Sequence, residues 1–412
     1  MTKGLLRESS GSEMKEGRMI INIGPSHPST HGAFRMITEI EGEVIVNCEV
    51  EIGYVHRGVE KFAENLKYKQ ILPLTDRLNY VSAIMNNIGY VTALERYMKI
   101  EVPKKAQYIR VILNELSRIS DHLTCIGPNV VDLGALTPFW YFFRERERIY
   151  EIIEMWTGAR LTTSYPWVGG LWRDHPWIGG FKDEIPAEFE KKVRSFLKTM
   201  KSAVDDVEAL LTGNRIFIER TKGIGVMPAE KALEYGWTGP CLRASGVAWD
   251  LRKVEPYMCY EDFDFEIPIG ENGDTYDRYL VRMEEIRQSM RIIEQAIDGL
   301  PEGPLMISDP RVCFPPKKEV YSTIEGLIRQ FELVMYDIQV PEGEFYYAVE
   351  AANGELGFYI VSDGTGKPYR FRIRPPCFAI YQAFPYLVKG LKIADLIAVL
   401  GSINIIAGEL DR

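Results

Sequence analysis

Two of the chain's five histidines, His27 and His31, lie four residues apart in the segment GPSHPSTHG (24–32). Proline stiffens this backbone and glycine permits close approach, while a neutral imidazole exchanges a proton near pH 7. The segment therefore suits a catalytic loop. A metal site needs further ligands, and neither an HExxH motif nor an Asp or Cys at ligand spacing accompanies the pair. From this segment alone, we favour a rigid turn whose imidazoles bond to the backbone.

Four other side chains that could take part in binding or catalysis lie in loops or at the ends of expected elements. Arg57 follows a strand end in GYVHRGVEK, and Arg77 and Tyr80 head a probable helix in LTDRLNY. Taken singly, these residues are best interpreted as two arginines on the surface and a tyrosine that packs against the core. Asp132 lies in the apolar run NVVDLGALTP, where a carboxylate is either partnered or shifted in pKa. The glycine-rich segments match neither of the phosphate-binding patterns GxxxxGK[ST] and GxGxxG.

The elements that must position these residues predict an α+β fold. FRMITEI and EVIVNCEVEI predict a hairpin that buries Val44, Val46 and Cys48 on one face. Apolar residues at helical spacing predict long helices over 105–123, 137–158, 187–211 and 276–297. Residues 344–374 predict three strands, and two short helical segments follow. We expect a central bundle of long helices between an N-terminal β-hairpin region and a small C-terminal β-sheet region.

Composition narrows the class of protein. The 412 residues carry a net charge of -9, which argues against nucleic acid or an anionic membrane surface as the partner. None of the six cysteines forms a CxxC pair, which argues against cysteine-held zinc or iron–sulfur. No stretch reaches the length needed to cross a bilayer, so we expect no transmembrane segment.

Changes in composition along the chain divide it into regions. Residues 1–18 lack the apolar stretch that a secretory signal contains, and their polar composition predicts a disordered lead-in. We expect an N-terminal β region at 19–58 and a helical core at 59–300 with an inserted loop at 166–180. The C-terminal β region and terminal helices at 301–412 should pack as one unit with that core.

Several segments, taken in order, resemble the D subunits of respiratory complex I, the quinone-site family of NADH-quinone oxidoreductases. They are GPSHPSTHG, IGYVHRGVEK, ILNELSRISDHL, DLGALTPFWYFFRERE, LRASGV, GDTYDRYLVR and GELGFYIVSDG. The resemblance runs from about residue 19 to Arg412. This family descends from the large subunit of nickel–iron hydrogenases, whose CxxC pairs hold the metals. Here the corresponding segments are DRLNY and GELDR. The resemblance therefore implies no metal held by this chain and a quinone headgroup in the emptied cavity.

The resemblance also implies a chemistry. A small iron–sulfur partner, the B subunit, holds a four-iron four-sulfur cluster that passes electrons to a quinone bound between the two proteins, and each carbonyl oxygen then takes up a proton. By resemblance, His31 and Tyr80 donate those protons, and Asp132 pairs with His31 and fixes its tautomer. Arg57 and Arg77 correspond to arginines that face the cluster, where positive charge raises its potential. This chain alone holds no cofactor.

Two departures from the family pattern matter. Relatives that use higher-potential quinones often carry a histidine two residues after the arginine of RLTTSY, where this chain has Thr162. We infer a lower, less pH-dependent cluster potential, which suits a menaquinone-type acceptor. In addition, the repeat WVGGLWRDHPWIGG looks like an insertion of roughly ten residues, within what surface loops tolerate. It brings His175, to which we give a surface role.

The implied assembly is a proton-translocating NADH:quinone oxidoreductase on the cytoplasmic face of the cell membrane, to which this chain belongs peripherally. Its expected partners are the B and C subunits, other peripheral-arm subunits and, in the membrane, the H subunit at the quinone entrance. One alternative is the equivalent subunit of a ferredoxin-fed or other non-NADH complex, because other subunits set the electron input. Another is a non-catalytic scaffold with the same fold, against which the presence of His31, Tyr80 and Asp132 together argues.

Overall fold

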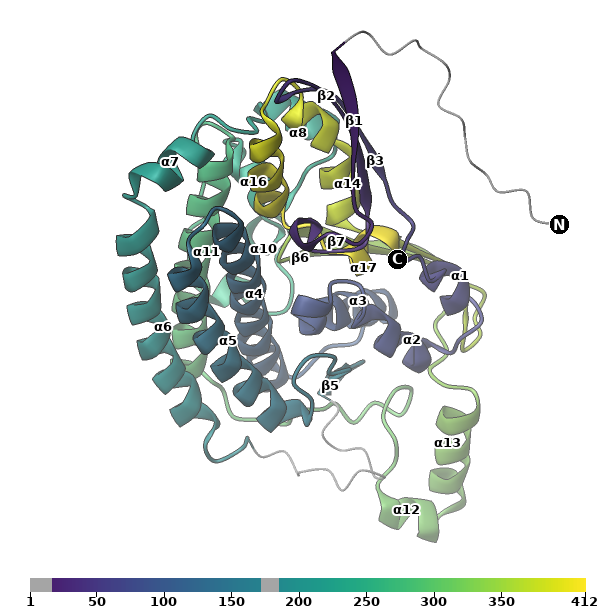
Figure 1. Cartoon of the computed structure of the whole chain (residues 1–412). Coiled ribbons are helices and arrows are strands. Elements are labelled where there is room, and N and C mark those ends of the chain that lie inside the picture. The colour runs from purple at the N-terminus through teal and green to yellow at the C-terminus, as the bar shows by residue number, and fades with distance from the viewer. Residues whose placement is uncertain (1–16, 172–184) are drawn as a thin grey trace, which may run out of the picture.

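The computed structural model describes residues 17–171 and 185–412. Helices occupy the middle of the molecule, and small antiparallel sheets come from the two ends of the chain, so the predicted α+β class is confirmed (Figure 1). Most of the expected lead-in, and the part of the expected insertion from residue 172 onward that includes His175, lie outside the described residues.

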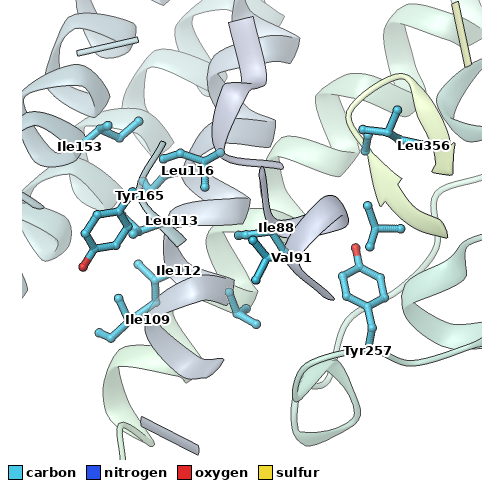
Figure 2. Packing of buried hydrophobic residues seen from close by; sticks show 14 of the residues in the cluster. Ile88, Val91, Ile109, Ile112, Leu113, Leu116, Ile153, Tyr165, Tyr257 and Leu356 are labelled. Atoms are coloured by element: carbon cyan, nitrogen blue, oxygen red, sulfur yellow. The ribbon is translucent and has the colours of Figure 1, made fainter. Parts of the chain in front are cut away.

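Long helices form the centre. They are α3 (Ala83–Met98), α4 (Lys104–Asp132), α5 (Leu136–Thr157), α6 (Phe189–Leu211) and α11 (Thr275–Asp298). Helix α4 packs against α3, α5 and α11, and its apolar stripe is buried as its periodicity predicts. Figure 2 shows Ile112 and Leu116 of this stripe in one cluster with Ile88 of α3 and Ile153 of α5. Each such side chain contributes about 1.5–3 kcal/mol when fully buried.

The N-terminal sheet has one strand more than predicted. Its order is β1 (Arg18–Ile23), β2 (Arg35–Glu41) and β3 (Val44–Glu51), all antiparallel. β1 begins within the expected lead-in. The predicted alternation in β3 is wrong for Val44, which is exposed, whereas Ile45 and Cys48 are buried. A β-bulge after Glu39 explains this, because an extra residue shifts the side chains beyond it to the other face.

The C-terminal region forms a second sheet and four short helices, rather than the two segments predicted. The sheet is β6 (Gly343–Ala351), β7 (Gly354–Ser362) and β8 (Pro368–Arg374), and the helices are α14 (Pro376–Gln382), α15 (Phe384–Val388), α16 (Ile393–Ile403) and α17 (Ala407–Asp411). These helices share a hydrophobic cluster with the N-terminal sheet. In Figure 1 the purple strands accordingly lie beside the yellow helices. The N-terminal sheet and the C-terminal helices thus pack together, and α16 of this group contacts α4.

Shorter elements connect these parts. The helices are α1 (Val59–Ala63), α2 (Tyr68–Thr75), α7 (Arg215–Thr221), α8 (Ala229–Glu234), α9 (Gly239–Ala244), α10 (Leu251–Val254), α12 (Lys317–Ser322) and α13 (Ile324–Met335), with 3-10 turns η1 (Pro28–Thr30), η2 (Tyr80–Ser82) and η4 (Tyr260–Asp262) and a two-residue-strand pair, β4 (Pro166–Trp167) and β5 (Gly170–Leu171). Among the described residues, none of the helices has both the length and the apolar character of a membrane span.

Candidate functional site

The histidine loop is built around η1. The imidazole Nδ1 of His27 accepts the backbone N–H of Ser29 at 3.2 Å, which caps the turn. The hydroxyl of Thr30 is buried and lies 2.7 Å from the carbonyl oxygen of His27 and 2.8 Å from that of Gly32. His31 then takes a left-handed backbone conformation with φ of 54°. The expected bonding of both imidazoles to the backbone holds for His27 only, because His31 bonds to a side chain instead.

His31 is paired with a carboxylate from the far end of α4. Its Nε2 lies 2.9 Å from Oδ2 of Asp132, the last residue of that helix. The two side chains are 32% and 18% exposed, so the pair lies at a recess and not in the closed core. A carboxylate so placed fixes the orientation and the tautomer of the ring.

Tyr80 stands at the first position of η2. Asn79 caps this turn by accepting the N–H of Val81 at 3.1 Å, and its amide donates to Asp121 of α4 at 2.8 Å. The turn is therefore fixed to the long helix, while Tyr80 itself remains 41% exposed. Partial burial raises the pKa of the Tyr80 phenol, and the nearby Cys377 thiol adds to this, whereas Arg57 opposes it. The phenol is accordingly protonated at neutral pH and can donate a hydrogen bond.

His31 and Tyr80 line the same cavity, which has a volume of about 250 Å³. Five apolar side chains form half of the remaining wall, which also includes the polar residues Thr30 and Thr124: Val81, Pro128, Leu400, Ile405 and Ile406. Asn404 adds a polar contact at the end of α16. The cavity thus combines apolar walls, suited to a flat ring, with a phenol and a carboxylate-paired imidazole as proton donors.

Arg57 and Arg77 lie next to each other beside this cavity. The guanidinium of Arg57 donates to the carbonyl oxygens of Arg77 at 2.7 Å and Gly408 at 2.9 Å. Partial burial lowers the pKa of Arg57, and the like charge of Arg77 lowers it further. The loop that carries Arg57 is held by Asp411, whose carboxylate accepts the N–H groups of Gly53 and Val55 at 2.8 and 2.9 Å. Helix α17 therefore positions Arg57, whereas the Arg77 guanidinium donates to the carbonyl oxygen of Pro73 at 2.6 Å.

Thr162 lies in the half-buried connection between α5 and β4 and is not among the residues that line the cavity. Two residues later, the Ser164 N–H and hydroxyl both donate to the carboxylate of Asp76, next to Arg77. The segment that carries Thr162 is thereby attached to the turn that carries Arg77.

The other described histidines have separate partners. His56 Nδ1 lies 2.7 Å from the carbonyl oxygen of Asp411, and buried His122 bonds through Nε2 to Glu285 at 2.7 Å. Within residues 17–171 and 185–412, no three His, Cys, Asp or Glu side chains are arranged to hold a metal ion.

Comparison with known proteins identifies the family. Residues 132–412 match the family described as "Respiratory-chain NADH dehydrogenase, 49 Kd subunit". The chain is a member of this complex I family. It is 51% identical to the NADH-quinone oxidoreductase D subunit of Myxococcus xanthus over 97% of this chain and 94% of that one, and 51% identical to the D subunit of Leptospira biflexa over 97% and 96%. A Bdellovibrio bacteriovorus relative, named as a joint C/D subunit, is 51% identical, and the match covers 98% of this chain and 70% of that one.

Membership of the 49 Kd family makes the chain part of a multisubunit oxidoreductase and confirms the predicted resemblance. It also implies a quinone as the substrate of the complex. Sequence reasoning missed the polar residues that hold the site from behind. Neither Asp121 nor Glu409 is among the residues that the sequence pattern singles out. The amide partners of Asp121 are 42 or more residues away in sequence, so local pattern did not reveal them.

Proposed function

We propose that this chain supplies the quinone-headgroup site of a proton-translocating NADH:quinone oxidoreductase. The observation that carries the proposal is the convergence of Tyr80 and the His31–Asp132 pair on one apolar-walled cavity. Reduction of a quinone adds two electrons and a proton at each carbonyl oxygen. Tyr80 donates one proton from its neutral phenol, and His31 donates the other from Nδ1 of its ring, while Asp132 holds Nε2.

The electrons come from a four-iron cluster in the B subunit, on the side of Arg57 and Arg77. Two neighbouring guanidinium groups repel each other, and hydrogen bonds to backbone carbonyls hold both of them, with Asp76 at 4.0 Å as a distant countercharge for Arg77. A negatively charged cluster opposite them relieves this repulsion, and their charge raises its potential. The further partners are the C subunit, other peripheral-arm subunits and the H subunit in the membrane. The chain itself is peripheral, on the cytoplasmic face of the cell membrane.

The acceptor we propose is a menaquinone-type quinone, because Thr162 stands where relatives with higher-potential quinones often carry a histidine. The electron donor is NADH in this proposal. A ferredoxin-fed complex would use the same quinone site, and the proteins that co-purify with the chain distinguish the two, since flavin- and NADH-binding partners are required only for NADH.

Tyr80→Phe tests the site. It removes only the phenolic hydroxyl, so we expect quinone reductase activity of the assembled complex to fall about 100- to 10,000-fold, the usual contribution of a positioned acid–base group. Tyr54→Phe is the matched control, because the Tyr54 hydroxyl donates to Glu51 at an exposed position away from the cavity. Near-normal turnover of Tyr80→Phe, with assembly intact, would remove the phenol from the reaction.

A further inference from the structure

A buried polar network lies directly behind the cavity, and the reaction described above leaves it unused. Glu409 of α17 is 2% exposed, and its carboxylate accepts the backbone N–H of Cys377 at 3.3 Å and lies 3.3 Å from the Cys377 thiol. Asp121 of α4 is 1% exposed and accepts the amides of Asn79 at 2.8 Å and Asn404 at 2.7 Å. Within the described part of the chain, neither carboxylate forms an ion pair with a Lys, Arg or His.

Hydrogen bonds connect the two carboxylates. The amide of Asn404 donates both to Asp121 and, at 2.6 Å, to Asn353, and the amide of Asn353 lies 3.4 Å from the Cys377 sulfur. Cys377 in turn meets Glu409. The network therefore runs from α4 through the end of α16, the β6–β7 turn and α14 to α17.

The network also reaches the cavity at two points. Asn404 lines the cavity wall, and Asn79 precedes Tyr80. Gly408, the neighbour of Glu409, packs so closely on Tyr80 that a Cβ placed there would lie 3.3 Å from the Tyr80 ring. Cys377 and Asp121 of this network each act on the pKa of both the Tyr80 phenol and Glu409, so the two groups share their buried neighbours.

Two buried carboxylates without a paired cation cannot both ionise cheaply. Burial raises the pKa of Glu409 to about 7, and the negative charge of Asp121 contributes to this. The groups that face Glu409 are the Cys377 thiol on α14, Asp121 on α4 and the cation Arg374 at the end of β8. Tyr80 on η2 and Arg57 lie against the neighbouring Gly408. Arg374 lowers the pKa of Glu409 only weakly, because its guanidinium donates to backbone carbonyls and Thr238.

We propose that Glu409 is a redox-linked protonation site, whose carboxylate takes up one proton from solvent when Tyr80 gives its own proton to the quinone. The step forms one O–H bond on Glu409 and consumes one proton. Protonation of a carboxylate involves no electrons. The proton that Tyr80 loses ends on the quinol oxygen, and the proton on Glu409 is a separate one from solvent. The physical cause is like-charge coupling through shared neighbours: a phenolate at Tyr80 adds negative charge to the buried region that holds Cys377 and Asp121, and this disfavours a further negative charge on Glu409.

This proposal rests on the proposed role of Tyr80, and its test separates the two. Infrared difference spectra of the assembled complex, recorded between the quinone-oxidised and quinone-reduced states, should show a newly protonated carboxylic acid. We expect the signal to be absent in Glu409→Gln, present but shifted in Glu409→Asp, and unchanged in Glu145→Gln. Glu145 is a matched control because it is fully buried on α5 yet paired with Arg144, away from the cavity.

The pH profile gives a second measurement. Ionised Glu409 opposes formation of the phenolate at Tyr80. Turnover of the unchanged complex should therefore fall as the pH rises through about 7, by about tenfold for each unit by which ionised Glu409 raises the pKa of Tyr80. Glutamine carries no charge, and Glu409→Gln should therefore keep its turnover at alkaline pH, whereas Glu409→Asp should restore the fall at a shifted pH.

Absence of a carboxylic-acid signal in the unchanged complex would overturn the proposal without any variant, as would an identical spectrum and pH profile in Glu409→Gln. If Tyr80→Phe abolishes turnover while Glu409 gives no signal, the quinone site stands and only the coupling fails. If Tyr80→Phe turns over normally, the proposed function fails first.

Discussion

At the scale of single residues, each side chain of the site is oriented by its backbone and held in place by a neighbouring group. His31 is aimed by a left-handed turn and restrained by Asp132. Tyr80 is aimed by a capped 3-10 turn and is restrained by packing against Gly408. Arg57 is aimed by the loop that Asp411 holds and restrained by two carbonyl oxygens. Each side chain thus has one feature that orients it and a different one that restrains it.

Thr162 allows a prediction at this scale. It has no ionisable group, so we expect the cluster potential of the unchanged complex to vary little between about pH 6 and 9. Thr162→His places an imidazole on the segment that Ser164 attaches to the Arg77 turn. Its protonated form would favour the reduced cluster, so the potential should rise and become pH-dependent near the ordinary pKa of histidine, about 6.5.

A redox titration of the assembled complex, monitored on the cluster signal, measures both quantities. Thr162→Val is the matched control, because it keeps the β-branched shape without a titratable group. A steep, proton-coupled slope in the unchanged complex would contradict the inference of a menaquinone-type acceptor.

At the scale of elements, close approach of α17 to the η2 turn holds the cavity together. A Cβ added to Gly408 would lie 2.8 Å from the carbonyl oxygen of Leu78 and 2.9 Å from that of Arg77. Backbone oxygens cannot move aside as a flexible side chain can. Alanine gains about 1 kcal/mol of helix propensity over glycine, which is too little to offset a clash with two carbonyl groups.

We therefore predict that Gly408→Ala separates α17 from η2 and displaces Tyr80. A shift of about 1 Å in a catalytic group costs on the order of a hundredfold in rate, so turnover should fall by that factor while assembly persists. Quinone reductase assays and native gels of the complex measure the two outcomes. Gly213→Ala is the control, since a Cβ there meets nothing within 4 Å. Equal turnover in the two variants would show that the contact does not position Tyr80.

At the scale of the whole molecule, the sequence predicts those features whose cause is local. The stripe of α4 appears at helical spacing because one face must be buried, and the end of α5 appears at Gly158, which takes a left-handed conformation. The roles of His31, Tyr80 and Asp132 came only from resemblance. The strand β1, the bulge between β2 and β3 and the partners of Glu409 and Asp121 follow from contacts between distant segments, which no local pattern contains.

The largest feature of that kind is a network of fully buried charges between α4, α9, α10, α11 and β6. Arg243 bonds to Glu285 at 2.6 Å and to Glu350 at 2.7 Å, and Glu285 also holds His122. Burial opposes ionisation of Glu285, but Arg243 and His122 outweigh it and lower the pKa of Glu285 well below the ordinary value. For Asp250, Arg252 and Arg243 likewise overcome burial and lower the pKa to about 2.

A carboxyl group whose pKa is lowered by folding stabilises the fold above its unfolded pKa, about 4, and loses that contribution as the pH falls toward the folded value. We therefore predict that the local opening free energy of α4, α9 and α11 declines as the complex is taken from about pH 7 to below about pH 4.

The variant Glu285→Gln removes one of the negative charges that face Arg243. This should lower the local opening free energy by about 3–5 kcal/mol at pH 7 and make its pH dependence shallower. Hydrogen exchange of the assembled complex, corrected for intrinsic rates, measures both, and Glu284→Gln on the outer face of the same helix is the control. A steep decline that is equal in all three forms would place the acid sensitivity outside this network.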